Sequence, residues 1–144
     1  MSQANQIQHR VLLLEEDPAA VAHARQACAL SDPPIQLTVV QNSDEALEWM
    51  AGIKAQDMMN LRLPNLLLLD LNLPKLSGLA VLRRMRMEVL LKDLPVVVFS
   101  SVHEPADVQQ SYQVGANSFV EKPASVADFS ELLSTQIAYW VKTR

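Results

Sequence analysis

The chain has 144 residues, of which 49% are apolar and 19% charged, so it can bury a core without help from metals or disulfides. The formal net charge of -4 gives no broad basic surface, which argues against nucleic acid and favours protein as the partner. Cys28 is the single cysteine, the first ten residues do not resemble a signal peptide, and no apolar run reaches the roughly 20 residues of a membrane span. We therefore expect a cytoplasmic protein that does not enter a membrane.

Five short apolar runs alternate with segments of helical periodicity, which is typical of β/α units on a parallel sheet. The expected strands are Val11–Leu14, Ile35–Val40, Asn65–Leu69, Pro95–Phe99 and Asn117–Glu121. The first, third and fourth runs are continuously apolar, as strands covered on both faces are. The second run alternates and the fifth is short and mixed, so we expect these two strands at the edges of the sheet.

Each expected helix is preceded by a capping signal. The signals are Asp17 with Pro18, Ser43 with Asp44 and Glu45, Ser77, Glu104 with Pro105, and Ser125 with Asp128. The fifth helix carries an apolar stripe, interpreted as core, at Phe129, Leu132, Leu133, Ile137 and Trp140. Between the second helix and the third strand, Gly52–Pro64 is longer than most such connections. We expect residues 10–142 to form a single domain after an N-terminal tail of residues 1–9.

Polar side chains gather where the expected strands end. They are Glu15, Glu16 and Asp17 after the first strand, Asp70 after the third, Ser100 and Ser101 after the fourth, and Glu121 and Lys122 after the fifth. In an open parallel sheet, ligands bind beyond the carboxyl ends of the strands, where strand order reverses. Carboxylates from neighbouring strands repel unless a cation lies among them, and the candidates are Lys122 and a divalent metal. An all-oxygen set with no nearby histidine favours Mg²⁺ over zinc.

Taken singly, these residues also have ordinary structural explanations, such as Asp17 as a helix cap, Ser100 as a turn residue and Lys122 as a surface lysine. The three histidines share no metal-binding spacing, and the three glycines are isolated. Zinc sites and nucleotide sites with glycine-rich loops are therefore not expected. The functional prediction depends on the combination of residues at the strand ends.

Four segments, in this order and spacing, resemble the receiver domain of two-component response regulators. They are VLLLEEDP, LLLLDLNLP, PVVVFSS and GANSFVEKP. The resemblance covers about Arg10–Trp140. It implies a chemotaxis-regulator (CheY-like) fold, that is, a three-layer, doubly wound (βα)5 flavodoxin-like α/β domain with strand order 2-1-3-4-5. The longer segments LLLLDLNLPKLSG and LKDLPVVVFSS are most similar to the small stand-alone regulators paired with bacterial and cyanobacterial phytochrome kinases.

The resemblance also implies a role for each polar residue. Asp70 would be the phosphoacceptor, whose carboxylate attacks the phosphorus of a phosphohistidine on a sensor histidine kinase. Mg²⁺ would be held by Glu15, Glu16, Asp70 and the backbone carbonyl of Asn72. The phosphoryl group would be bound by Ser100, Lys122 and the backbone amide of Leu71. Phe119 would turn inward when Ser100 moves, which reshapes the surface of the fourth helix, fifth strand and fifth helix. Such a protein is no conventional enzyme, because it catalyses only its own phosphorylation and slow autodephosphorylation.

Glu16 departs from the family, which usually has an aspartate there. Its extra methylene moves the carboxylate by ~1.5 Å, about one carbon–carbon bond. Magnesium demands near-ideal octahedral geometry and tolerates such a shift poorly. We expect weakened metal binding, with the adjacent Asp17 as a candidate to compensate.

A single receiver domain would deliver its output by protein contact, and Tyr139 and Trp140 favour a homodimer through the face of the fourth helix, fifth strand and fifth helix. The first alternative is a pseudo-receiver, the same fold used as a phosphorylation-independent interaction or dimerisation module, which Glu16 would mark. The second is a small Mg²⁺-dependent hydrolase with Asp70 as nucleophile. That alternative is disfavoured because no cap domain is expected to enclose a substrate.

Overall fold

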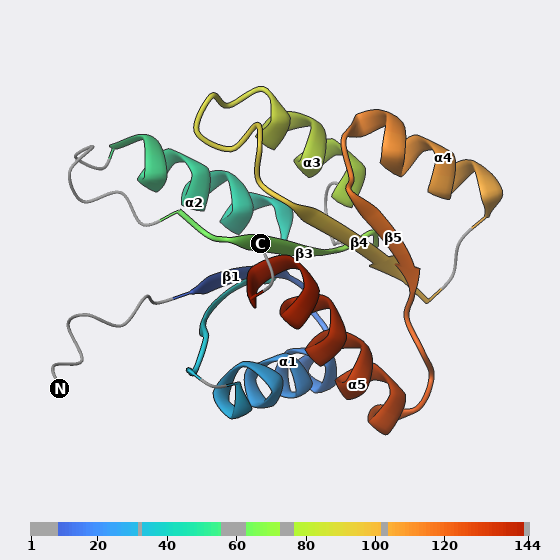
Figure 1. The fold of residues 1–144 in the computed structure, drawn as a ribbon. Helices are drawn as coiled ribbons and strands as arrows, with labels where there is room; N and C mark the ends of the chain where they lie inside the picture. The colour runs from blue at the N-terminus through green and yellow to red at the C-terminus, as the bar shows by residue number, and fades with distance from the viewer. Residues whose placement is uncertain (1–8, 32, 56–62, 73–76, 102–103, 143–144) are drawn as a thin grey trace, which may run out of the picture.

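The computed structural model describes residues 9–31, 33–55, 63–72, 77–101 and 104–142 of the chain. Within these ranges five parallel strands form one sheet in the predicted order β2-β1-β3-β4-β5 (Figure 1). The strands are β1 (Arg10–Leu14), β2 (Gln36–Val40), β3 (Leu66–Asp70), β4 (Val96–Ser100) and β5 (Ser118–Glu121). Apart from His9, the predicted N-terminal tail lies outside the described residues.

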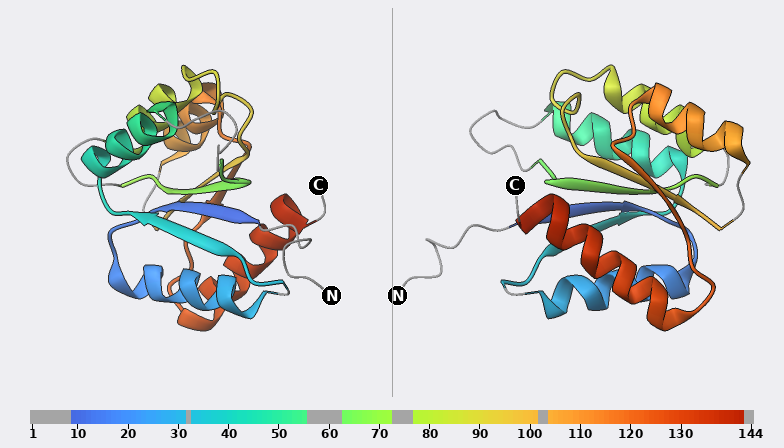
Figure 2. Two further views of the ribbon diagram at one scale, coloured as in Figure 1. Left: turned by 90° about the vertical axis from the view of Figure 1, so that its left-hand side faces the viewer. Right: turned by 45° about the vertical axis from the view of Figure 1, so that its right-hand side comes forward.

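Helices cover both faces of this sheet (Figures 1 and 2). One face carries α2 (Ser43–Ala55), α3 (Gly78–Arg86) and α4 (Pro105–Val114), and the other carries α1 (Pro18–Leu30) and α5 (Val126–Ile137). A short π-helix, η3 (Ala138–Lys142), continues α5. Each face has its own apolar core. The predicted three-layer, doubly wound α/β fold is therefore confirmed.

The leucine run of β3 is buried on both faces of the sheet. Leu67 and Leu69 pack into the core on the side of α2 and α3, whereas Leu66 and Leu68 pack into the core on the side of α1 and α5. Parallel strands covered by helices on both sides require apolar residues at every position, which explains the unbroken run. In β2, burial alternates along the strand, as at a sheet edge. The predicted central and edge strands are both confirmed.

Side chains before the helices accept hydrogen bonds from the first turns, as predicted. Asp17 accepts from the N–H of Ala19 (3.1 Å), Ser77 from Ala80 (3.3 Å) and Ser125 from Asp128 (3.1 Å). At α4 the acceptor lies within the helix: the side chain of Asp107, in the first turn, accepts from the N–H of the preceding Glu104 (2.8 Å). For α2 the capping residue differs from the prediction. Ser43 is the first helical residue, and Asn42 before it accepts from the N–H of Glu45 (3.0 Å).

Several predicted boundaries differ from the structure by one or a few residues. The strands β3 and β4 each extend one residue further than predicted, so Asp70 and Ser100 are the last residues of their strands. The predicted connection Gly52–Pro64 is shorter, because α2 continues through Ala55. Its residues 56–62 lie outside the described part of the chain.

The apolar stripe of α5 packs as predicted. Phe129, Leu133 and Ile137 are buried in the core that α5 shares with α1, while Leu132 and Trp140 pack against it partly buried. These contacts fix the helix beside β5 and its carboxyl end. Among the helices of the described ranges, none is long and apolar enough to cross a membrane.

Gly78 lets α3 begin very close to the end of β3. Its N–H donates to the carbonyl oxygen of Leu71 (3.0 Å), and a Cβ at this position would lie only 2.6 Å from the carbonyl oxygen of Asp70. A side chain here would therefore push the helix away from the strand end. The backbone of Asp70 is held by this close approach.

Candidate functional site

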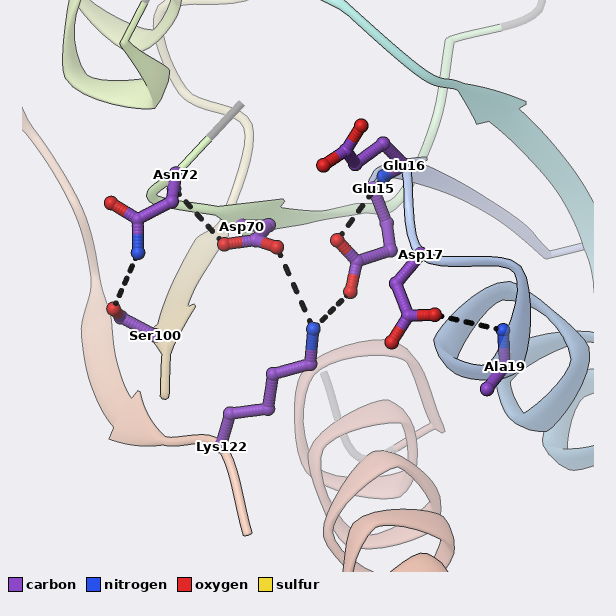
Figure 3. Close-up of polar contacts among 8 residues, drawn as sticks. All are labelled: Glu15, Glu16, Asp17, Ala19, Asp70, Asn72, Ser100 and Lys122. Atoms are coloured by element: carbon purple, nitrogen blue, oxygen red, sulfur yellow. Dashed lines mark hydrogen bonds and ion pairs between the residues drawn. The ribbon is translucent and has the colours of Figure 1, made fainter. Parts of the chain in front are cut away.

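The carboxyl ends of four strands converge at one edge of the sheet. Glu15 follows β1, Asp70 ends β3, Ser100 ends β4, and Lys122 follows β5. The register pairs Asp70 with Phe99, and Ser100 with Glu121, so the four functional groups are brought to the same level (Figure 3). This edge lies where strand order reverses between β1 and its neighbours, as the rule for open parallel sheets predicts.

Asp70 is buried to 8% exposure, but both of its carboxylate oxygens have partners. The backbone N–H of Asn72 donates to Oδ1 (3.0 Å), and Nζ of Lys122 lies 3.5 Å from Oδ2. Both contacts stabilise the ionised carboxylate, since each places positive charge or a donor beside it. Asp70 is thus a buried carboxylate that faces a cation.

Glu15 shares that cation. Its side chain is fully buried, with Oε1 in contact with Nζ of Lys122 and Oε2 accepting from the N–H of Glu16 (3.2 Å). The pKa of Glu15 is raised to about 8, chiefly by burial and next by the neighbouring Asp70, against which the contact with Lys122 acts in the lowering direction. Two carboxylates therefore compete for one ammonium group.

Lys122 is positioned by its backbone as well as by its side chain. Its N–H donates to the carbonyl oxygen of Ser100 (2.9 Å), which continues the pairing of β5 with β4. Burial lowers the pKa of Lys122, but its contacts with Glu15 and the charge of Asp70 outweigh that effect and raise it. Lys122 consequently remains an ammonium ion across the physiological range.

Ser100 is fully buried, and its hydroxyl accepts a hydrogen bond from the side-chain amide of Asn72 (3.2 Å). The sequence predicted only the backbone carbonyl of Asn72 as functional, so this contact was missed. An amide two residues after the expected nucleophile was the available signal. Asn72 contacts both Asp70 and Ser100 and so links the ends of β3 and β4.

The backbone amide of Leu71 is not directed at the site as predicted. It donates to the carbonyl oxygen of Phe99 (3.0 Å), which continues the pairing of β3 with β4. The amide that reaches the Asp70 carboxylate is that of Asn72, one residue later. The reason is that the sheet hydrogen bonds extend one residue beyond the point where the prediction ended the strand.

Glu16 and Asp17 are exposed, unlike Glu15, although the charge of Asp17 contributes to the raised pKa of Lys122. The side chain of Glu16 is exposed and points away from Asp70 and Lys122 (Figure 3). Asp17 is also exposed, and its carboxylate caps α1. In the ranges that the structure describes, no three acidic, histidine or cysteine side chains form a metal-binding group.

The donors nevertheless fit a hard divalent cation in chemical type. Two buried carboxyl groups from the ends of β1 and β3 lie at one ammonium group, that of Lys122. Oxygen ligands of this kind suit Mg²⁺ or Mn²⁺ rather than zinc. Glu15, Asp70 and the carbonyl of Asn72 are the candidate ligands, and Glu16 would have to turn inward to join them.

Phe119 lies on the same face of the sheet as Ser100. In the β4–β5 register Phe119 pairs with Val98 and Glu121 with Ser100, and residues two apart on a strand share a face. The Phe119 ring packs, partly buried, against the core on the side of α2 and α3, and its N–H donates to the hydroxyl oxygen of Tyr112 on α4 (3.1 Å). Ser100 and Phe119, the predicted switch residues, therefore lie on one sheet face, with Val98 beside Phe119 and two residues before Ser100.

A crevice of about 590 Å³ opens beside Lys122. It is lined by Asp17, Ser101, Glu121, Lys122, Pro123 and Ala124. Lys122 is the residue of the central group that lines this crevice, which lies on the side of the site formed by the end of β5 and the start of α1.

Comparison with known proteins agrees with this geometry. Residues 11–134 match the family described as response regulator receiver domain. The chain belongs to this family. Its members act in two-component signalling together with sensor histidine kinases, so the predicted family and fold are confirmed.

Several relatives resemble the chain over nearly its whole length. Response regulator Rcp1 of Synechocystis sp. is 31% identical over 134 residues, which cover 92% of this chain and 89% of the relative. The crystal structure of the phosphorylated cyanobacterial phytochrome response regulator RcpA superposes with a TM-score of 0.85 at 29% identity, covering 96% of this chain and 97% of that one. The Mn²⁺-bound form of Rcp1 gives a TM-score of 0.80 at 30% identity, covering 94% and 96%.

Proposed function

We propose that this receiver domain accepts a phosphoryl group on Asp70 from a phosphohistidine of a sensor histidine kinase. The observation that carries the proposal is the environment of the Asp70 carboxylate. It ends β3 beside Lys122, which lines a crevice, with Lys122 Nζ 3.5 Å from one oxygen and the N–H of Asn72 on the other. A nucleophile in this setting is held in place next to a cation that can pair with an arriving phosphoryl group.

The transfer is a displacement at phosphorus. A carboxylate oxygen of Asp70 forms the new O–P bond, the P–N bond of the phosphohistidine breaks, and its electron pair returns to the imidazole nitrogen. The product is an acyl phosphate. Lys122, which keeps its proton, balances charge on the phosphoryl oxygens. The hydroxyl of Ser100 leaves the amide of Asn72 and donates to a phosphoryl oxygen.

A divalent metal fits the same site, held by Glu15, Asp70 and the backbone carbonyl of Asn72. When bound, Mg²⁺ would neutralise charge on the crowded oxygens and on the transferring group. The Mn²⁺-bound form of the relative Rcp1 supports a metal in this family. Glu16 would have to turn inward to contribute, and its extra methylene would then weaken metal binding.

We propose a phytochrome-type kinase as the donor, since RcpA, which is similar over 96% of this chain, is described as a phytochrome response regulator. The output would be a protein contact on the surface of α4, β5 and α5. Two observations support this surface: Ser100 and Phe119 share a sheet face, and Tyr112 of α4 bonds the backbone of Phe119. A homodimer through this surface remains part of the proposal, with Tyr112 48% exposed on it.

The decisive experiment uses acetyl phosphate with Mg²⁺ and intact-protein mass spectrometry. The wild type should gain one phosphoryl group, Asp70→Asn should gain none, and Glu48→Gln, at an exposed position of α2, should behave like the wild type. A folded wild type that gains no phosphoryl group at any Mg²⁺ concentration would exclude the proposal.

One observation favours the pseudo-receiver as a second candidate, namely the exposed side chain of Glu16. A domain without its usual third carboxylate could serve as a constitutive interaction module. The same mass measurement separates the two functions. A pseudo-receiver would stay unmodified and would keep its partners after Asp70→Asn, whereas a phosphoacceptor would lose the donor-dependent change in binding.

A further inference from the structure

The ammonium group of Lys122 lies over two aromatic rings. Its Nζ is 5.5 Å from the ring centroid of Phe99 and 5.6 Å from that of Phe129. Both distances are within the roughly 6 Å over which a cation is attracted to the face of an aromatic ring. Lys122 is therefore surrounded by carboxylates and by rings.

The two rings are fixed by the core on the side of α1 and α5. Phe99, the residue of β4 before Ser100, and Phe129 of α5 are both buried, with their centroids 5.9 Å apart at 56°. His23 of α1 packs edge-on against Phe129, at 6.2 Å and 80°. Three elements thus hold the rings, and the rings have little freedom to move away from Lys122.

The rings compensate for water that Lys122 has lost. The Lys122 side chain is only 14% exposed, so its ammonium group has lost most of its hydration. Glu15 and Asp70 supply negative charge through directed contacts, whereas the negative ring faces attract the cation without demanding a particular hydrogen-bond geometry. An aliphatic side chain in place of either ring would fill the space but would not attract the charge.

We infer that Phe99 and Phe129 are positioning residues, which act on phosphoryl transfer through Lys122. They hold Nζ beside Asp70 and let it move from the Asp70 carboxylate to an oxygen of the arriving phosphoryl group without loss of stabilisation. Because this attraction does not depend on a particular hydrogen-bond direction, the rings stabilise Nζ both beside the Asp70 carboxylate and beside the phosphoryl oxygen. The inference rests on the proposed phosphoacceptor function, which it extends to two residues without a polar group.

Stepwise fluorination of Phe129 tests the inference, because fluorine withdraws charge from the ring face and barely changes its shape. The full-length protein carries 4-fluoro-, 3,5-difluoro- or 3,4,5-trifluorophenylalanine at position 129, and its rate of phosphorylation by acetyl phosphate is measured. The rate should fall with each fluorine, by about three- to tenfold at the third. A rate that is the same for all four rings would overturn the inference.

A packing control separates charge attraction from core stability. Ile137 belongs to the same core as Phe129 but lies at the far end of α5. Ile137→Val therefore alters this core and should leave the phosphorylation rate within about twofold of that of the wild type. A rate loss in Ile137→Val as large as that in the trifluoro protein would assign the effect to packing and would contradict the inference.

A measurement without phosphorylation keeps the inference testable if the proposed function fails. In NMR spectra the ε-methylene protons of Lys122 should be shifted upfield by the ring currents, and Phe129→Leu should remove much of that shift. If the wild type forms no adduct on Asp70, the proposed function is wrong. The spectra then still test whether Lys122 lies over the two rings. Protons of Lys122 at ordinary shifts in the wild type would overturn the ring contact itself.

Discussion

The side-chain amide of Asn72 donates a hydrogen bond to the hydroxyl of Ser100 at 3.2 Å, and this bond ties the loop after β3 to the end of β4. Both residues belong to the proposed phosphoryl site. Here the serine oxygen accepts from the amide, and in the proposed function the hydroxyl gives up this bond when it moves to a phosphoryl oxygen. The bond to Asn72 therefore stabilises the unphosphorylated form.

Removal of the Asn72 amide should favour the activated form. Asn72→Ala removes the hydrogen bond that Ser100 would have to break. The affinity for beryllium fluoride, a mimic of the bound phosphoryl group, should therefore rise about two- to tenfold, which corresponds to the free energy of one hydrogen bond. Titration followed by the fluorescence of Trp49 and Trp140 measures it. Ser100→Ala is the opposing control and should weaken binding. Unchanged affinity in Asn72→Ala would mean that the bond does not oppose activation.

Shortening Glu16 should strengthen metal binding. The present carboxylate points away from Asp70 and Lys122, and if a metal draws it inward the octahedral site must accommodate its extra methylene, which Glu16→Asp removes. Mg²⁺ affinity should increase by about tenfold, the lower end of effects for residues around a metal. Isothermal titration calorimetry of both proteins gives the comparison, with Asp17→Asn as the neighbouring control expected to change little. Equal or weaker affinity in Glu16→Asp would refute this explanation of the departure from the family.

Two glycines should respond to alanine in opposite directions. In Gly78→Ala the new Cβ would lie 2.6 Å from the carbonyl oxygen of Asp70, so the protein should lose about 1–3 kcal/mol of unfolding free energy. Gly52, within α2, has no atom within 4 Å of an added Cβ, so Gly52→Ala should gain about 0.5–1 kcal/mol. Urea unfolding measures both. A neutral Gly78→Ala would show that α3 can move off the strand end without cost.

Cys28 should make stability fall at alkaline pH. Burial raises the pKa of its thiol from 9.0 to about 11, so between these values the unfolded chain releases the proton while the folded protein keeps it. Ionisation then favours the unfolded chain, and stability present below pH 9.0 is progressively lost, by about 1.4 kcal/mol at pH 10.

The measurement for Cys28 is urea unfolding from pH 8 to 10.5, compared with Cys28→Ala. The alanine variant should lack the part of the alkaline loss that belongs to the thiol, whatever its stability at pH 8. Parallel curves for the two proteins would contradict the raised pKa. Slow alkylation of Cys28 in the folded protein is a second expected result, because the thiolate is the reactive form.

Local patterns were sufficient to predict the sheet and the position of Asp70. The unbroken leucine run of β3 is typical of a strand that helices cover on both faces. A carboxylate directly after this run is therefore expected at the carboxyl edge of the sheet, where ligands bind. The capping residues Asp17, Ser77 and Ser125 were equally predictable, because a cap depends on residues at most three positions away.

The side-chain directions at the site were harder to predict. Glu15 and Glu16 are neighbours on an extended chain, so their side chains point to opposite sides and only Glu15 reaches Lys122. The direction of the Leu71 amide depended on where the pairing of β3 with β4 stops. The contact of Lys122 with Phe99 and Phe129 depends on how α5 packs against β4, which no spacing in the sequence encodes.

The last two residues of β4 face opposite layers of the domain. Phe99 belongs to the core shared with α1 and α5 and lies beneath Lys122, whereas Ser100 shares its sheet face with Phe119. In the proposed function the Phe99 ring would act only on the receipt of the phosphoryl group, through Lys122, whereas Ser100 would both bind that group and pass the change to Phe119. Substitutions of Phe99 would then alter the rate of modification without altering the sheet face that carries the signal.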